Sequence, residues 1–155
     1  SPERTAEELA LPGGHFQLFV QKLGYQALLG LGLLENTITK DNHEAVKAKY
    51  ILELANGPLT NDADDAISKR EIITIPDVLA NSGGVTVSYY EWVQNLESLS
   101  WDEDEVNERL RKKMVHAFKR VIRMQEERNV DMRTAAYMLG IKELADAVET
   151  RGIFP

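Results

Sequence analysis

The spacing of hydrophobic and polar positions changes about halfway along the chain. In the first half, short apolar runs are separated by polar segments that contain glycine or proline. This pattern predicts strands over residues 27–33, 50–54 and 72–75, and short helices over residues 39–48 and 62–70. Strands that alternate with helices at such short spacing indicate a parallel α/β unit.

In the second half, the apolar residues recur every three or four positions, which is the period of an α-helix. We expect one helix over residues 89–99, a second that begins after Ser100 or Asp102 and ends at Asn129, and a third that Asp131 caps. The apolar stripe of the second helix comprises Val106, Leu110, Met114, Ala117, Phe118, Val121 and Ile122. The inner face expected for the third helix comprises Ala135, Ala136, Leu139, Leu144, Ala145 and Val148.

Composition and charge exclude several classes of function. The 155 residues include 18 Lys and Arg against 25 Asp and Glu, and the net charge of −7 argues against nucleic acid or an anionic membrane as a partner. The chain has no cysteine, so disulfides and thiolate metal sites are excluded. No apolar run is long enough to span a membrane. These features together favour a cytoplasmic protein.

The remaining metal-ligand types do not predict a metal site. His15, His43 and His116 stand alone and lack the spacing of zinc ligands. The acidic residues around Asp64 lack the pattern of a calcium-binding loop, and we interpret them as a solvated helix start.

The segment from Pro76 to Trp92, PDVLANSGGVTVSYYEW, carries the strongest local signal. A strand that ends at Pro76 is followed by a loop with two glycines, which permit a close backbone approach to a ligand, and then by a helix. The free N–H groups of such a helix suit a carbonyl, carboxylate or phosphate group at the carboxyl end of a parallel strand. Asn81 and Ser88 are placed to orient that ligand. A capped turn with Asn81 as the helix cap explains the pattern equally well.

The same segment resembles the glutamate/leucine/phenylalanine/valine dehydrogenases, and its run Ser-Tyr-Tyr-Glu-Trp resembles the glutamate branch of that family. Tyr90 is a mild departure, because the family usually has phenylalanine there. The resemblance extends from about residue 28 to residue 155, whereas residues 1–26 match poorly. Further motifs that carry it are Leu-Glu-Asn-Thr-Ile-Thr at 34–39, Ala-Asn-Gly-Pro at 55–58 and Asp-Met-Arg-Thr-Ala-Ala-Tyr at 131–137.

The resemblance implies a fold and a set of site residues. Within one domain, residues 28–87 would be the end of a Rossmann-like nucleotide-binding domain with an incomplete parallel sheet of about three strands, and residues 88–155 would be C-terminal helices. Ser88 would donate a hydrogen bond to the side-chain carboxylate of the substrate, and a neutral donor there needs no buried counter-charge. The implied cofactor contacts are made by Asn36, Asn56, Gly57 and Asn81.

The implied cofactor is NAD or NADP, and the sequence favours neither. Residues 30–35 read G-x-G-x-x-E, so that the carboxylate of Glu35 stands where a dinucleotide fingerprint has its third glycine. We interpret this pattern as a false match, and the residues that read the adenosine ribose are absent with the fingerprint. The family's catalytic lysines and aspartate lie in a substrate domain that has no counterpart here, so no catalytic residue is expected in this chain.

Two functions fit these observations. The first is part of an NAD(P)-dependent glutamate dehydrogenase, which oxidises L-glutamate to 2-oxoglutarate and ammonia, with the chain alone inactive and the enzyme a homo-oligomer. The alternative is a non-catalytic dehydrogenase-like module that associates with a full-length dehydrogenase subunit or with itself through an uncovered sheet edge. A fragment, a natural truncated relative and a composite with a foreign segment 1–26 all fit the sequence.

Overall fold

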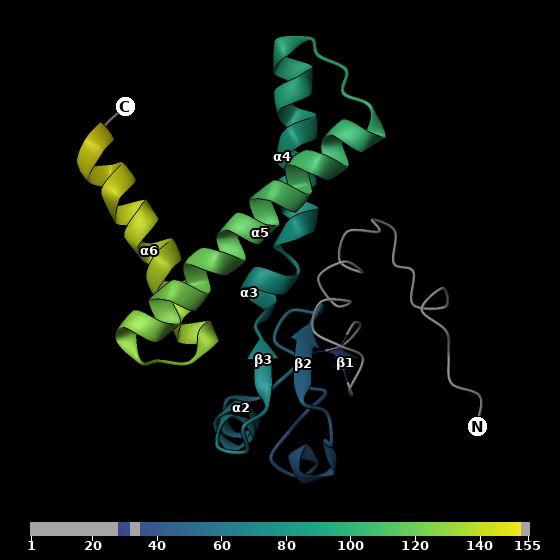
Figure 1. Ribbon diagram of the computed structural model, residues 1–155, viewed down its shortest axis with the longest axis vertical. Helices are drawn as coiled ribbons and strands as arrows, with labels where there is room; N and C mark the ends of the chain where they lie inside the picture. The colour runs from purple at the N-terminus through teal and green to yellow at the C-terminus, as the bar shows by residue number, and fades with distance from the viewer. Residues whose placement is uncertain (1–27, 32–34, 153–155) are drawn as a thin grey trace, which may run out of the picture.

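The computed structural model describes residues 28–31 and 35–152, and its described part has the expected α/β class (Figure 1). A parallel sheet holds the strands in the order β1, β2, β3, with Leu28 opposite Tyr50 and Tyr50 opposite Ile73. The helical turns and strands are β1 (Leu28–Leu31), η2 (His43–Ala45), β2 (Tyr50–Glu53), α2 (Asn61–Ser68), β3 (Ile73–Ile75), α3 (Asp77–Ala80), α4 (Ser82–Glu97), α5 (Glu103–Arg128) and α6 (Met132–Arg151). Residues 1–27, which include the poorly matching segment expected over 1–26, lie outside the described residues.

The middle strand β2 is buried on both of its faces. Ile51 and Leu52 are 0% and 2% exposed, and successive side chains of a strand point to opposite faces. Ile51 belongs to an apolar cluster with α2 and the segment before β2, whereas Leu52 belongs to a second cluster on the helical side. Covered faces are typical of parallel sheets. The first cluster comprises Ile38, Val46, Ile51, Leu59, Ala63 and Ile67.

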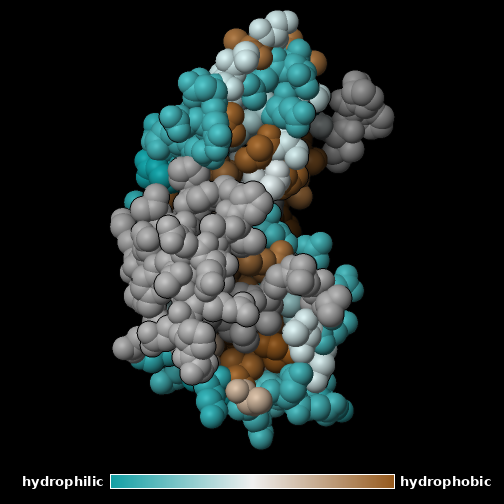
Figure 2. All heavy atoms as spheres, turned by 90° about the vertical axis from the view of Figure 1, so that its right-hand side faces the viewer, coloured by the Kyte–Doolittle hydropathy of each residue, from teal (hydrophilic) through white to brown (hydrophobic). Residues whose placement is uncertain are grey.

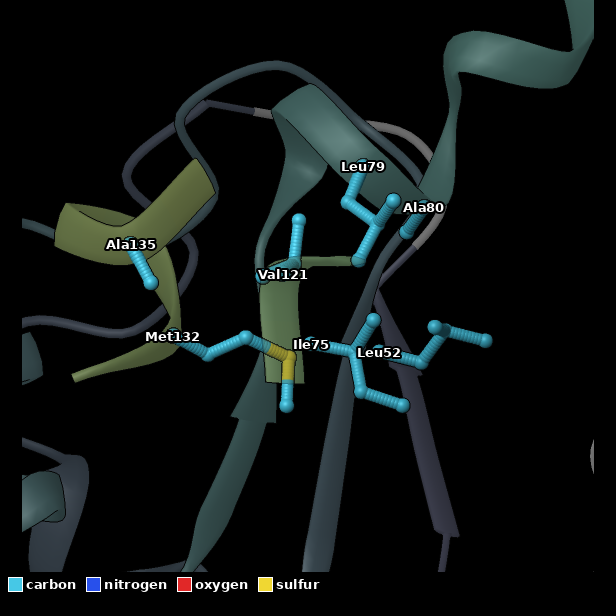
Figure 3. Packing of buried hydrophobic residues seen from close by; sticks show 7 residues of the cluster. All are labelled: Leu52, Ile75, Leu79, Ala80, Val121, Met132 and Ala135. Atoms are coloured by element: carbon cyan, nitrogen blue, oxygen red, sulfur yellow. The ribbon is translucent and has the colours of Figure 1, made fainter. Parts of the chain in front are cut away.

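The second cluster joins the sheet to the long helices. In Figure 3 the side chain of Met132 reaches toward Ile75 and Leu52, with Val121 beside them. These side chains come from α6, β3, β2 and α5, so that elements far apart in the sequence share one buried core. The full set is Leu52, Ile75, Leu79, Ala80, Val121, Met132 and Ala135.

The helix expected over residues 39–48 is wrong beyond the single 3-10 turn η2. The Asn42 side chain accepts a hydrogen bond from the Thr39 N–H at 2.8 Å and donates one to the Thr37 carbonyl at 3.0 Å. Such local bonds between side chains and backbone compete with the helical ladder, which explains why a helical pattern ends as a turn.

The loop expected around the paired glycines is also wrong, because α4 already begins at Ser82 and includes both of them. A Cβ atom on Gly83 would lie 3.8 Å from Leu110 Cδ1 and 4.0 Å from Met114 Sδ. The close approach that this glycine permits is therefore made by α5. Residues 85–87, where the sequence fits either a strand or the start of a helix, belong to α4.

The caps predicted for the two long helices are confirmed. Asp102 accepts a hydrogen bond from the Glu105 N–H at 2.8 Å and begins α5, and Asp131 accepts one from the Thr134 N–H at 2.9 Å and begins α6. Helix α5 ends at Arg128, and its C-cap residue, Asn129, has a left-handed φ of 51°. Asparagine tolerates this conformation better than most residues.

The inner face predicted for α6 is correct only in its first turns. Ala135 is fully buried, but Leu144 is 70% exposed and Val148 is 46% exposed. Figure 1 shows the reason, because α6 rises away from α5 after its first turns. Helix α4 also exposes apolar residues along one of its faces, among them Val85 and Trp92. Figure 2 shows hydrophobic patches between hydrophilic ones in the helical part.

Candidate functional site

The carboxyl ends of the three parallel strands lie along one edge of the sheet, which is where open α/β sheets bind ligands. Strand β2 continues there into the segment 54–58, and β3 continues through Pro76 into α3 and α4. Asn36 lies in the connection that follows β1. The polar residues predicted for the site therefore reach this edge of the sheet on three separate connections, one after each strand.

The structure brings four of the predicted residues together at this edge. The backbone N–H of Asn36 donates to the Gly57 carbonyl at 2.9 Å. The side-chain amide of Asn81 donates to the Asn56 Oδ1 at 2.8 Å and lies 3.5 Å from the Leu54 carbonyl. We call the set Asn36, Asn56, Gly57 and Asn81 the amide cluster.

The backbone of the amide cluster is specialised at two positions. Asn36 has a φ of 52° and Gly57 a φ of 55°, both in the left-handed region. Glycine carries no steric cost there, and asparagine carries a small one. The Gly57 N–H also donates to the Asp77 Oδ2 at 2.8 Å, which ties the turn after β2 to the start of α3.

The role of Asn81 differs from that of a side-chain cap. Asn81 stands at the N-cap position of α4, but its side chain makes no capping hydrogen bond there. The amide contacts Asn56 instead. The capped-turn interpretation is therefore wrong for this side chain, and its orientation depends on a neighbouring connection.

Ser88 is the one predicted site residue that stands apart from the amide cluster. It is exposed on α4, six residues after the first residue Ser82, or about 9 Å along the helix axis. No hydrogen bond joins Ser88 to the amide cluster within the part of the chain that the structure describes. The described contacts thus leave its hydroxyl facing solvent on the same helix that begins at the cluster.

A buried charge cluster behind this edge was missed by the sequence analysis. Glu53, the last residue of β2, is 0% exposed, and Arg133 of α6 contacts its Oε1 at 2.5 Å through Nη2. Arg133 also binds Asp64 Oδ2 at 2.7 Å through Nε and Asp77 Oδ1 at 3.2 Å through Nη1. We call these four residues the Arg133 cluster. Asp64 is therefore an ion-pair partner, and its interpretation as part of a solvated helix start is wrong.

The electrostatics of the Arg133 cluster follow from burial and pairing. Burial raises the pKa of the Glu53 carboxyl above its ordinary value, while the hydrogen bonds from Arg133 and from the Asp77 N–H oppose that shift. Burial also disfavours the charged guanidinium, but the bonds to Glu53 and Asp64 outweigh it and raise the pKa of Arg133. A signal for this cluster was present in the sequence, since a glutamate ends a buried strand and needs a partner.

The described residues contain no group of three or more histidine, aspartate or glutamate side chains arranged to hold a metal ion. Among the helices of residues 35–152, none combines the length and the apolar character needed to cross a membrane.

Comparison with known proteins assigns the family. The family model described as glutamate/leucine/phenylalanine/valine dehydrogenase matches residues 31–152. The chain belongs to this family. Among curated relatives, the glutamate dehydrogenase of Thermotoga maritima is 53% identical over 122 residues, which are 79% of this chain and 29% of that protein. The NAD-specific glutamate dehydrogenase of Clostridioides difficile is 51% identical over 119 residues, which are 77% of this chain and 28% of that protein.

Solved structures of this dehydrogenase family share the fold. Glutamate dehydrogenase from Peptoniphilus asaccharolyticus superposes with a TM-score of 0.78 at 40% identity, covering 90% of this chain and 35% of that one. The hetero-hexameric glutamate dehydrogenase from Thermus thermophilus gives a TM-score of 0.79 at 31% identity, covering 83% of this chain and 31% of that one. The chain thus spans about a third of the length of these dehydrogenases.

Proposed function

We propose that this chain is the nicotinamide end of the nucleotide-binding domain, with the C-terminal helices, of an NAD-dependent glutamate dehydrogenase. In this proposal residues 28–87 end a Rossmann-like sheet, residues 88–155 form the helical segment, and the whole enzyme converts L-glutamate to 2-oxoglutarate and ammonia. The observation that supports it most is the amide cluster at the carboxyl edge of the sheet, in a chain of this family.

The amide cluster has the donor set that a nicotinamide riboside needs. Asn36 and Asn56 are exposed at this edge, and amide groups supply both donors and acceptors for a carboxamide and for ribose hydroxyls. The side chain of Asn81 is hydrogen-bonded to that of Asn56. We therefore assign Asn81 two roles, which are to orient the Asn56 side chain and to contact the cofactor. When bound, the cofactor supplies the hydride acceptor.

NAD is proposed as the cofactor in preference to NADP. Relatives from Clostridioides difficile and Staphylococcus aureus, 51% and 49% identical, carry the name NAD-specific glutamate dehydrogenase. The neutral amide cluster is compatible with either cofactor, because the two differ at the adenosine ribose.

Ser88 is proposed as the substrate residue. Its hydroxyl is exposed on the helix that begins at the amide cluster, and a hydroxyl can donate to one carboxylate oxygen of glutamate. Hydride transfer requires substrate and cofactor to be held in contact. One helix that carries both Asn81 at its start and Ser88 farther along provides a common frame for the two ligands.

Activity, assembly and location belong to the whole enzyme in this proposal. The described residues supply one side of a cleft between two domains, and we therefore expect the isolated chain to show no turnover. We propose that the enzyme is a cytoplasmic oligomer of dehydrogenase subunits. The exposed apolar faces of α4 and α6 support this, since uncovered apolar surface favours association.

A segment exchange tests the proposal. Residues 31–152 replace the matching segment of the Thermotoga maritima glutamate dehydrogenase, and glutamate-dependent NADH formation is measured. We expect the hybrid to be active with NAD and Ser88→Ala to raise its KM for glutamate. Ser100→Ala, the control, should change neither the rate of NADH formation nor this KM. An inactive but folded hybrid would contradict the function and favour the non-catalytic module. An unchanged KM in Ser88→Ala would remove the substrate assignment.

A further inference from the structure

Arg133 is linked to the amide cluster through one carboxylate. Asp77 presents Oδ1 to Arg133 Nη1 at 3.2 Å and accepts the Gly57 N–H on Oδ2 at 2.8 Å. Both oxygens of Asp77 are therefore engaged, one by the C-terminal helix α6 and the other by the turn after β2. A rotation of this carboxylate would break or bend the bond to Gly57.

Glu53 fixes the same aspartate from a second side. Its Oε2 accepts the Asp77 N–H at 2.8 Å, while its Oε1 pairs with Arg133. A fully buried carboxylate is stable only when it is paired and hydrogen-bonded. Arg133 therefore holds Asp77 in two ways. It contacts the side chain of Asp77 directly, and it holds the backbone of Asp77 through Glu53.

The link continues from Gly57 to the connection after β1. The Gly57 carbonyl accepts the Asn36 N–H at 2.9 Å, so both backbone groups of Gly57 are used. Gly57 has a left-handed backbone with no side chain to hold it, and nothing lies within 4 Å of where its Cβ would be. Gly57 itself is therefore placed by its hydrogen bonds, between the exposed Asn56 and the fully buried Pro58.

We infer that Arg133 is a positioning residue for the nicotinamide site, acting through Asp77 on the turn at Asn56 and Gly57. The inference rests on the proposed function of the amide cluster. The chemistry requires arginine, because a guanidinium has a planar set of donors that reach Glu53, Asp64 and Asp77 together. The docking of α6 on the sheet and the geometry of the turn at Asn56 and Gly57 therefore depend on each other.

A purely structural role makes a different prediction from a positioning role. If Arg133 only stabilised the fold, its loss would lower the protection of all slowly exchanging amides together. A positioning role lowers the protection of the Gly57 and Asn36 amides more than that of amides in the middle of α5. Hydrogen exchange followed by NMR on the 155-residue chain separates the two.

The variants are Arg133→Gln, Arg133→Lys and, as matched control, Arg120→Gln. Arg120 pairs with Glu143 across α5 and α6 at the surface, and the ion pairs of the Arg133 cluster do not include it. We expect Arg133→Gln to speed exchange at Gly57 and Asn36 by about tenfold relative to α5, which corresponds to about 1.4 kcal/mol. Arg133→Lys keeps the positive charge and a folded chain but loses the planar set of guanidinium donors. The Gly57 amide should therefore exchange as fast as it does in Arg133→Gln.

The functional arm uses NAD as the probe in the hybrid dehydrogenase. We expect Arg133→Lys to raise the KM for NAD by about tenfold with a smaller effect on kcat, because the turn is loosened while the fold is retained. Arg120→Gln should leave both parameters unchanged.

The outcomes separate this inference from the proposed function. Exchange at Gly57 that stays unchanged, or that rises only in step with α5, overturns the positioning role whatever the hybrid does. Selective exchange together with an unchanged KM for NAD in an active hybrid overturns the link to the cofactor. A hybrid without turnover contradicts the proposed function, and the exchange data then still decide whether Arg133 positions the turn.

Discussion

The side-chain amide of Asn81 donates a hydrogen bond to Asn56 Oδ1 at 2.8 Å, across 25 residues of sequence. The contact joins the start of α4 to the turn after β2, two connections that leave the sheet at its carboxyl edge. It also orients the Asn56 amide group, because its oxygen is committed to Asn81. The geometry of the candidate site is thus set between connections rather than within one of them.

A double-mutant cycle measures this contact. We expect Asn56→Ala and Asn81→Ala to couple by about 0.5–1.5 kcal/mol in the free energy of unfolding, because they share one neutral hydrogen bond. Urea denaturation gives the four free energies. Asn95→Ala, an exposed asparagine on the same helix, is the control and should be additive with Asn56→Ala. Additivity at Asn81 as well would contradict the contact.

Two glycines should respond to alanine with opposite signs. Gly57 has a φ of +55°, so alanine there should destabilise by about 1–2 kcal/mol although its Cβ meets no atom within 4 Å. Gly84 lies inside α4, also with nothing within 4 Å, and alanine should stabilise by up to about 1 kcal/mol. Thermal denaturation of both variants tests this, and a shift of the same sign in both would refute the backbone argument.

The buried Glu53 carboxyl gives stability a specific pH dependence. Burial raises its pKa in the folded chain, so the folded state binds the proton more tightly than the unfolded state does. The resulting contribution is present below the unfolded pKa and is lost as the pH rises through the folded pKa. Compared with Glu53→Gln, the wild type should therefore lose stability as the pH rises above about 4.

Denaturation curves of both proteins across this pH range give the difference directly. Glu97→Gln, at an exposed glutamate of α4, controls for the substitution itself. A wild type that gains stability over Glu53→Gln as the pH rises would show that pairing with Arg133 outweighs burial.

The cap of α6 should behave in the opposite way. Burial disfavours the ionised form of Asp131, but hydrogen bonds from Thr134 outweigh it and lower the pKa of this carboxyl. Its contribution is present above the unfolded pKa and is lost as the pH falls through the folded pKa. Asp131→Asn keeps a capping oxygen that does not titrate, so the wild type should lose stability relative to it below about pH 4.

Circular dichroism melts at several acidic pH values test this prediction, and Asp131→Ala supplies the scale of the cap itself. Its loss should cost about 1 kcal/mol near neutral pH. Parallel acid profiles for the wild type and Asp131→Asn would show that the cap does not titrate in this range.

The features that the sequence predicted well depend on neighbouring residues. Asp102 and Asp131 cap helices by bonding to N–H groups three positions later, and Asn129 ends α5 through its own backbone. The strand expected over residues 50–54 is β2, one residue shorter than predicted. It was predictable because the apolar run that identifies the strand is also what buries it. Such information is local and can be read from one stretch of chain.

The features that the sequence analysis missed depend on distant partners. Arg133 and Glu53 are 80 positions apart, and only the fold shows that they meet. Gly83 suggested a loop that a ligand approaches. The element that approaches this glycine is instead α5, which a glycine pattern in the sequence does not reveal. Asn36, Asn56 and Gly57 follow from the family resemblance alone, and Asn81 also from its place after β3, whereas their mutual contacts follow from the parallel order of the strands.

The second half of α6 shows a different limit. Its apolar period predicted an inner face, and the period is real, but Leu144 has no described element to pack against. Periodicity indicates which residues share a face of a helix. It does not indicate whether the partner of that face lies within the same stretch of chain.

The sharing of one guanidinium among three carboxylates also bears on how this sequence can diverge. Loss of Arg133 leaves three acids facing one another, and loss of Glu53 leaves the others without their buried anchor. The effect of a substitution at one of these positions then depends on which residues occupy the other three. Descendants of this gene should therefore change the four positions jointly or keep them all, and sites of pronounced epistasis are expected there.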